Sequence, residues 1–183
     1  ISRAKSTVDY PASFMLISSM NPCPCGYYNH PEKDCLCSPG IVQKYLNKIS
    51  GPLLDRIDLH VEVTPVSFSE LSSKEKGESS KDIRKKVILS REIQEKRFSK
   101  SEKTYSNSHM SSKQLQDFCK LDNESSEMLK TAMEKLDLSA RAYNRILKVS
   151  RTISDLDDSE NIESQHIAEA IQYRSLDREG WAG

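Results

Sequence analysis

The sequence lacks the loop that many nucleoside triphosphatases use to hold phosphate. That loop follows the pattern G-x-x-x-x-G-K-[ST], whose backbone amides cradle the phosphates while the lysine and the hydroxyl hold phosphate and metal. None of the 6 glycines is followed by lysine, and no apolar run ends in an Asp-Glu pair that could hold the metal. These residues alone therefore exclude a complete enzyme of that class.

Long apolar runs and an excess of one charge are also missing. No run is long enough to span a bilayer or to act as a secretory signal. Lys+Arg and Asp+Glu number 27 each. We therefore expect a cytoplasmic protein without a membrane partner. The chain begins at Ile1 without an initiator methionine, and we expect it to be a piece of a longer protein.

The balanced total hides an uneven distribution of charge. Basic residues gather in segment 81–103, and acidic residues gather in segment 155–163. A basic run of this kind is more often a solvated helix face than a nucleic-acid contact. Two interpretations of segment 81–103 stay open: its basic side chains are exposed to solvent, or they contact DNA.

The uninterrupted apolar run Phe14–Ile17 predicts a strand covered on both faces of a sheet. Pro22 cannot extend a hydrogen-bond ladder, so we expect the strand to stop at Asn21. Ligands bind at the ends of strands in α/β sheets, and the amide of Asn21 would be presented there. The alternative is that Asn21 merely begins a turn before Pro22.

Periodicity divides the rest of the chain into an α/β part and an all-helical part. Alternating Leu59, Val61 and Val63 predict a strand with one buried face. A polar Ser/Lys/Glu-rich stretch at 67–81 is typical of a linker. Beyond it, apolar residues recur at helical spacing and predict a bundle of four or five helices. The longest apolar stripe consists of Ala142, Ile146, Val149, Ile153 and Leu156.

Four of the 5 cysteines form two close pairs, Cys23-x-Cys25 and Cys35-x-Cys37. Four thiolates can make a tetrahedral zinc site, and in a reducing compartment metal is favoured over a disulfide. The spacing is tighter than the usual C-x-x-C, so four reduced structural thiols are an equal alternative. His30 is a spare candidate ligand.

Three motifs resemble the magnesium chelatase-like branch of the AAA+ ATPases, and within it the ComM-like group. They are YPASF through NPCPCG at 10–26, SGPLLDRIDL at 50–59 and LSARAYNRILKVSRTI at 138–153. Together they span nearly the whole chain in the family's order. The resemblance implies an α/β plus all-α fold: the C-terminal half of an AAA+ α/β core at 1–66, a linker at 67–81, and a helical-bundle lid subdomain at 82–183.

The resemblance also implies roles in catalysis. Asn21 would be the first sensor, which orients the attacking water or contacts the terminal phosphate. Arg56 would be an arginine finger acting in trans on the nucleotide of the next subunit. A planar, permanently charged guanidinium suits charge spread over phosphoryl oxygens. The alternative without a catalytic role is that Arg56 forms a surface ion pair with Asp55 or Asp58.

Arg141 matches the second phosphate sensor of the family and binds the ATP phosphate in that account. The residues themselves add an argument, because Ser139 is a good N-cap and places Arg141 in the first helical turn. The macrodipole disfavours a cation there, which suggests an anionic partner. Arg145 has a weaker claim to the same nucleotide. With Lys148 the two arginines form a basic stripe on the predicted helix, for which solvated charge is the commoner explanation.

The implied parent is a homo-oligomeric ring, expected to be a hexamer, that binds ATP and Mg²⁺. It would couple hydrolysis to the remodelling of DNA in transformation or recombination. The chain by itself should be inactive, because the phosphate loop is missing. Two alternatives stay open: a metal-chelatase motor subunit, and a non-enzymatic cysteine-rich and helical interaction module.

Overall fold

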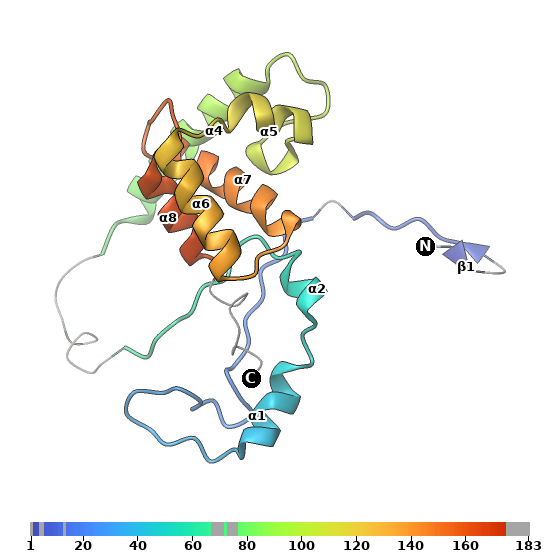
Figure 1. The fold of residues 1–183 in the computed structure, drawn as a ribbon, viewed down its shortest axis with the longest axis vertical. Helices are drawn as coiled ribbons and strands as arrows, with labels where there is room; N and C mark the ends of the chain where they lie inside the picture. Colours follow the sequence, from blue (N-terminus) through green and yellow to red (C-terminus); the bar gives the residue numbers. More distant parts are fainter. Residues whose placement is uncertain (1, 4–5, 13, 67–71, 73–76, 175–183) are drawn as a thin grey trace. The chain divides into compact units, whose positions relative to one another are not determined.

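The computed structural model of this chain describes residues 2–3, 6–12, 14–66, 72 and 77–174. The chain forms two compact units, Ile1–Tyr45 and Leu46–Gly183, which we describe separately. The described residues form a helix-rich, mixed structure with one small two-stranded sheet (Figure 1). Most of the expected linker, 67–71 and 73–76, lies outside the described residues.

In the first unit, the residues that the structure describes form two short paired strands, a long irregular segment and one helix. Strands β1 (Ser2–Arg3) and β2 (Ser6–Thr7) pair antiparallel, with Ser2 opposite Thr7. Helix α1 (Pro39–Leu46) begins after the cysteine-rich segment and continues to the unit boundary. Val42 and Leu46 are its buried apolar residues.

The strand predicted at Phe14–Ile17 does not form. These residues have no regular secondary structure, and Met15 and Ile17 are 84% and 83% exposed. The alternating segment Leu59–Val63 is also irregular, and it buries His60 rather than the three apolar residues. The physical reason is that a strand needs a neighbouring strand to satisfy its backbone. Among the described residues, only β1 and β2 pair in a sheet.

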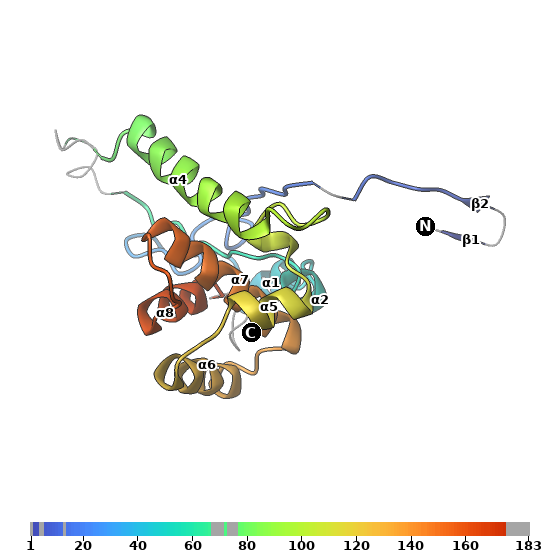
Figure 2. The same ribbon diagram turned by 90° about the horizontal axis from the view of Figure 1, so that it is seen from above.

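The predicted helical part is confirmed. After the short helix α2 (Gly51–Leu54), the described residues of the second unit form a 3₁₀ turn and five longer helices; these are α4 (Ser80–Phe98), η1 (Asn107–His109), α5 (Ser112–Phe118), α6 (Asn123–Lys135), α7 (Ala140–Leu156) and α8 (Ser164–Gln172). Helix α7 contacts α4, η1, α5 and α8, while α6 packs on α8 (Figures 1 and 2). Helix α7 is therefore the centre of the unit.

Side-chain caps fix where these helices begin. The hydroxyl of Ser139 accepts a hydrogen bond from the amide of Ala142, so the predicted N-cap of α7 is confirmed. Ser111 and Gln114 form a reciprocal capping box at α5. The carboxylate of Asp122 accepts from the amide of Ser125 at the start of α6. Each cap satisfies an amide that has no partner inside its own helix.

The apolar stripe of α7 forms the middle of the core. Ala142, Ile146 and Ile153 are buried, Val149 is half-buried, and Leu156 at the helix end is 44% exposed. Around this stripe lie the other buried apolar residues of the cluster, which are Phe98, Met110, Leu115, Cys119, Leu129, Leu147, Ile162, Ile167 and Ala170. The predicted stripe is thus buried except at its last turn. Helix α7 is also buried beyond this stripe, at Leu147, Ser150, Arg151, Ser154 and Asp155.

Helix α4 packs differently from its sequence pattern. The helical spacing of Ile83, Val87, Ile88 and Ile93 predicts an amphipathic helix with a buried face, but the first three are 47%, 47% and 46% exposed. The helix instead buries side chains of its C-terminal half, Gln94 and Phe98 among them. Figure 2 shows the N-terminal half of α4 projecting away from the other helices of this unit. Within the described part of the chain, every helix is too short or too polar to pass through a bilayer.

Candidate functional site

The cysteine-rich segment of the first unit folds into a compact turn. The amide of Gly26 donates to the carbonyl of Cys23 at 3.0 Å, which closes the first Cys-x-Cys pair into a tight loop. Gly26 adopts φ 83°, a left-handed conformation that glycine accepts without steric cost. The turn directs Cys23 inward, where it is fully buried, while Cys25 is half-buried.

The two cysteine pairs meet in space. All four Sγ atoms of Cys23, Cys25, Cys35 and Cys37 lie within 4.8 Å of one another. The sulfur of Cys23 is 3.3 Å from that of Cys25 and 3.7 Å from that of Cys35. A tetrahedral zinc–thiolate site with bonds of about 2.3 Å separates its sulfurs by roughly 3.8 Å. The donor set and its spacing therefore fit a zinc ion.

The neighbouring groups favour a thiolate within this cluster. A hydrogen bond from the backbone of Tyr27, aided by the thiol of Cys23, lowers the pKa of Cys25 to about 6. At Cys35 and Cys37 a backbone hydrogen bond that lowers the pKa is outweighed by burial and by the neighbouring thiols, so both pKa values are raised. Metal ligands of this type must be deprotonated. His30 has a different task, because its Nδ1 accepts hydrogen bonds from the amides of Glu32 and Lys33 at 3.0 and 3.1 Å. The cluster is thus a four-cysteine group without His30.

Cys119 is not part of this group. It is buried in the core of the helical unit, where burial raises the pKa of its thiol to about 11. Asn21 precedes the cluster by two residues and is exposed on irregular backbone. The role of Asn21 as a first sensor stays a prediction.

Arg56 follows α2 on an exposed turn of the second unit. Its Nη1 donates to the carbonyl of Pro52 at 2.8 Å, which folds the side chain back along its own helix. Leu54 is buried and anchors the short helix. Asp58, one of the acids considered as a surface partner for Arg56, pairs instead with Arg145.

The three basic residues of the α7 stripe differ in their contacts. Arg141 is exposed in the first turn. Arg145 donates from Nε to the carbonyl of Asp55 at 2.8 Å, and its Nη1 pairs with the carboxylate of Asp58. Lys148 donates to the carbonyl of Ser108 at 2.7 Å, and burial lowers its pKa. The contacts of Arg145 are therefore with protein groups, which the sequence did not reveal.

A buried ion network joins α4 to α7. The carboxylate of Asp155, which is 2% exposed, accepts from Arg97 at 2.5 and 2.7 Å and from Arg151 at 3.2 Å. Asn107 is buried beside it and donates to the same carboxylate at 2.8 Å. Arg151 also donates to the carbonyls of Ser159 and Glu160. Arg151 and Asp155 are four residues apart on α7, but sequence patterns gave no signal for Arg97 and Asn107, which lie on other elements.

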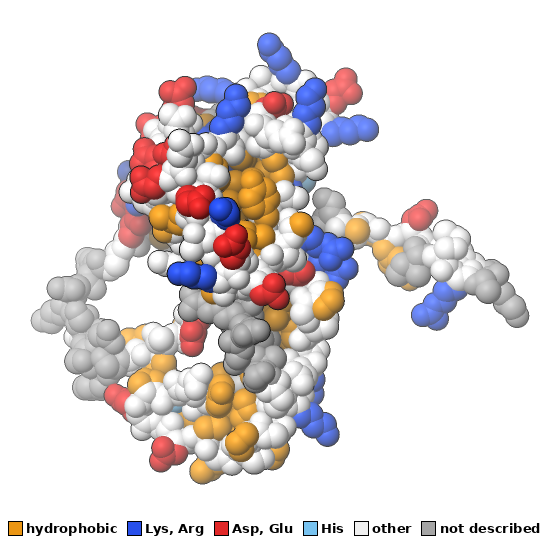
Figure 3. Space-filling model, in the orientation of Figure 1, with side chains coloured by type: hydrophobic (Ala, Val, Ile, Leu, Met, Phe, Trp, Pro, Cys, Tyr) orange, Lys and Arg blue, Asp and Glu red, His pale blue; other side chains and the backbone are white. Residues whose placement is uncertain are grey.

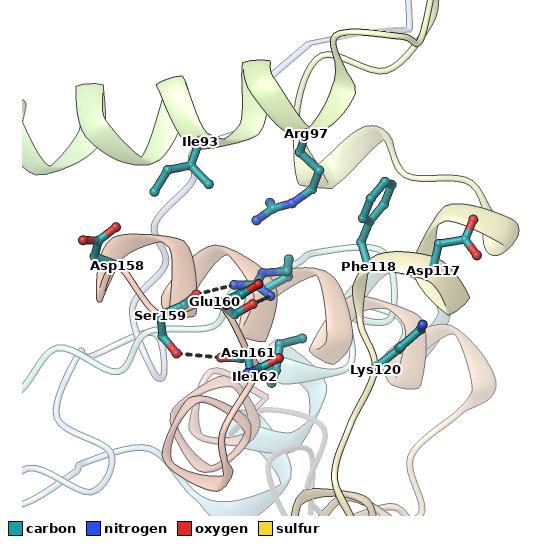
Figure 4. A pocket seen from close by; sticks show the side chains of 11 residues that line it. Ile93, Arg97, Asp117, Phe118, Lys120, Asp158, Ser159, Glu160, Asn161 and Ile162 are labelled. Carbon is teal, nitrogen blue, oxygen red and sulfur yellow. Dashed lines mark hydrogen bonds between the residues drawn. The ribbon is translucent and has the colours of Figure 1, made fainter.

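A cleft of about 470 Å³ opens beside this network. Figure 4 shows Arg97 on α4 facing the turn after α7, with Ile93 and Phe118 beside the opening. Arg97 and Arg151 line the cleft, but both are bonded to Asp155. We therefore regard the cleft as part of the structural core rather than as an anion site.

The basic segment at 81–103 is partly neutralised. Lys85 pairs with Asp82 at 3.0 Å and Lys86 with Glu78 at 2.7 Å, both on the surface, while Arg97 is held by Asp155. On the face drawn in Figure 3, side chains of both charge signs are mixed over the helical unit. Contact between this segment and DNA stays a prediction.

The fold and these sites define a class of protein: a helix-rich module that carries a four-cysteine cluster and exposed arginines. Residues 77–174 match the family model for the C-terminal part of magnesium chelatase subunit ChlI, and residues 1–71 match the model for magnesium chelatase subunit ChlI itself. The chain belongs to this magnesium chelatase ChlI family.

Curated relatives agree with this assignment. The chain is 42% identical over 179 residues to competence protein ComM of Haemophilus influenzae, covering 97% of this chain and 34% of the relative. It is 41% identical over 182 residues to the uncharacterized protein YifB of Escherichia coli, again covering 97% of this chain and 34% of the relative. The chain thus spans about a third of the length of these relatives. The prediction of a ComM-like, magnesium chelatase-like protein is confirmed.

Proposed function

We propose that this chain is the part of a ring-forming AAA+ ATPase that carries the sensors, the trans-acting arginine and the lid. The family match over residues 1–71 and 77–174 carries the proposal. In this account the helical unit is the lid subdomain, and the segment up to residue 66 completes the α/β core. Other segments of the longer protein would supply the phosphate loop and the ligands of Mg²⁺.

Three residues have named tasks in the proposed reaction. Asn21 orients the attacking water or contacts the terminal phosphate, Arg141 binds the phosphate of its own subunit, and Arg56 stabilises charge on the nucleotide of the next subunit. Positioning and electrostatics supply most of the catalysis in phosphoryl transfer, so these groups act without covalent chemistry. The exposure of Arg56 and Arg141 supports their tasks, since both can approach an anion outside the unit.

We further propose that the ring remodels DNA. The support is the similarity to a relative whose name is competence protein ComM. The family name, magnesium chelatase, supports the alternative of a motor for metal insertion. The two functions require the same ATPase chemistry but different partners, so the partner that stimulates hydrolysis distinguishes them.

The decisive assay is ATP hydrolysis by the full-length protein with and without single-stranded and branched DNA. We expect DNA to stimulate hydrolysis, and Arg56→Ala to lower the stimulated rate by about a thousandfold. Lys130→Gln is the matched control, because it removes an exposed positive charge on α6 that pairs with nearby Glu127. Hydrolysis indifferent to every DNA would favour the chelatase motor, and full activity of Arg56→Ala would exclude the trans-acting arginine.

A second function, zinc binding by Cys23, Cys25, Cys35 and Cys37, is favoured by the approach of the four sulfurs to within 4.8 Å. We propose that a zinc ion closes the turn from residue 23 to residue 37. Such a closed, four-ligand site is structural, because no coordination position is left for a substrate.

Elemental analysis of protein purified without chelator tests this second proposal. We expect about one zinc per chain in the wild type, and loss of the zinc in Cys35→Ser. Cys119→Ser is the matched control, because this thiol lies in the helical core and should leave the zinc content unchanged. A wild-type protein free of zinc would favour four reduced thiols.

A further inference from the structure

Two arginines hold the turn that carries Arg56. From α7, Arg145 donates to the carbonyl of Asp55 at 2.8 Å and pairs with the carboxylate of Asp58. From the residues after α8, Arg174 donates from Nη1 to the carbonyl of Ile57. The two carbonyls that these arginines hold belong to Asp55 and Ile57, the residues immediately before and after Arg56. These contacts join positions separated by 90, 87 and 117 residues.

The same turn is tied to the helical unit at two further points. Leu54 is buried just before it, and the amide of His60 donates to the carbonyl of Tyr173 at 2.8 Å just after it. Arg174 is 1% exposed, so its contact with Ile57 is shielded from solvent. The backbone around Arg56 is thus fixed, although the Arg56 side chain itself is exposed.

A fixed backbone matters for an arginine that acts on the nucleotide of another subunit. A long side chain on a mobile turn would spread its charge over many positions, and a misplacement of about 1 Å can lower a rate about a hundredfold. Arg145 suits the holding task because its planar guanidinium uses two different nitrogens for two acceptors. A lysine at this position could not reproduce that geometry.

We propose that Arg145 is a positioning residue that fixes the direction of Arg56 and couples it to helix α7. The inference rests on the proposed role of Arg56 as the trans-acting arginine. Arg141 lies four residues before Arg145, one turn away on the same helix. A shift of α7 caused by nucleotide at Arg141 is transmitted through Arg145 to the turn that presents Arg56. Arg145 thereby links the nucleotide of one subunit to the arginine offered to the next.

A double-mutant cycle on the full-length protein tests this inference. ATP hydrolysis is measured for the wild type, Arg56→Ala, Arg145→Gln and the double variant. We expect Arg145→Gln to lower kcat by about ten- to a hundredfold with KM for ATP changed less than about twofold. Because Arg145 acts through Arg56, the double variant should be no slower than Arg56→Ala alone.

The outcomes separate this inference from the proposed function. If Arg56→Ala is slow but Arg145→Gln is normal, or if the two losses multiply, Arg145 does not act through Arg56 and the inference is overturned alone. Multiplied losses with a raised KM would assign Arg145 to the phosphate instead. If Arg56→Ala is fully active, the trans-acting arginine is wrong and the inference falls with it.

A second variant separates positioning from a loss of folding. Asp58→Asn removes the acidic partner of Arg145 while Arg145 keeps its bond to the Asp55 carbonyl. We expect an intermediate loss of kcat and faster hydrogen exchange in residues 53–58, with α7 still protected. Lys130→Gln is the control for charge loss. Unchanged exchange in 53–58 for both Asp58→Asn and Arg145→Gln would overturn the positioning role.

Discussion

Different interactions stabilise the helical unit and the cysteine-rich unit. The helical unit satisfies its backbone within each helix and buries a cluster of apolar side chains around α7. In the first unit Phe14–Ile17 are exposed, and four cysteine sulfurs lie within 4.8 Å of one another. A segment with few buried apolar groups therefore depends on cross-links or on partners for its order.

If the proposed zinc is bound, its removal should change the first unit far more than the helical unit. In zinc-finger peptides the apparent binding free energy of structural zinc is about 10–16 kcal/mol. We expect a chelator to abolish hydrogen-exchange protection in residues 23–37 while α7 remains protected. Exchange followed by mass spectrometry with and without chelator measures both regions at once. Unchanged protection of 23–37 in protein shown to be metal-free would contradict a metal-held turn.

The substitution Asp155→Ala tests the helical unit by itself. It leaves Arg97 and Arg151 without their shared carboxylate, and breaking a buried ion pair costs about 3–5 kcal/mol. We expect denaturant unfolding of the helical unit to shift by that amount, with the zinc content unchanged. Asp117→Ala, an exposed acid on α5, should shift unfolding by less than about 0.5 kcal/mol. Equal shifts for the two variants would show that the network does not stabilise the unit.

Two isoleucines, one on a buried helix face and one on an exposed face, should differ in how much they contribute to stability. Ile146→Ala on α7 should destabilise the unit by about 2–5 kcal/mol, because it leaves a cavity where Ile146 is 1% exposed. Ile83→Ala on α4 should be close to neutral, because Ile83 is 47% exposed. Chemical denaturation measures both. A large loss at Ile83 would show that the N-terminal half of α4 packs against something in solution.

The smallest expected effect concerns the cap of α7. Ser139→Ala removes the acceptor for the amide of Ala142 and should cost about 1 kcal/mol. Ser126→Ala, at an exposed position in α6, should cost less, because alanine is the better helix former. Thermal unfolding of the pair gives the difference. A neutral Ser139→Ala would mean that water replaces the cap at no cost.

Local rules predicted the helical unit well. The cap at Ser139 and the stripe through Ala142, Ile146 and Ile153 follow from interactions within a few residues, and a helix needs no distant partner for its hydrogen bonds. The strands predicted at Phe14–Ile17 and Leu59–Val63 failed for the opposite reason. Their apolar patterns describe a sheet, and the described residues supply no neighbouring strand for either segment.

The candidate sites were predictable to different degrees. The paired spacing of the cysteines was enough to expect that they meet, because a short loop separates the pairs. The partners of Arg145 were not predictable, since Asp55 and Asp58 lie 90 and 87 residues away. Arg174 lies in no motif and was not predicted to have a role. Asp155 was grouped with the acidic segment 155–163, and the structure shows instead that it is buried and paired with Arg97 and Arg151. Sequence patterns thus proposed candidate groups for chemistry, whose roles stay predictions, and the structure revealed the groups that hold the turn around Arg56.

The most direct test of the central claim is a mixing experiment with two inactive full-length variants. In the proposed ring, Arg56→Ala would remove the arginine offered to the next subunit, whereas Asn21→Ala would remove the proposed sensor of a subunit's own site. If Arg56 acts in trans, a co-assembled mixture contains interfaces with an intact Asn21 and an intact Arg56, and ATP hydrolysis should return above the level of either variant alone. A mixture as inactive as its components, with assembly confirmed, would contradict the ring with a trans-acting arginine.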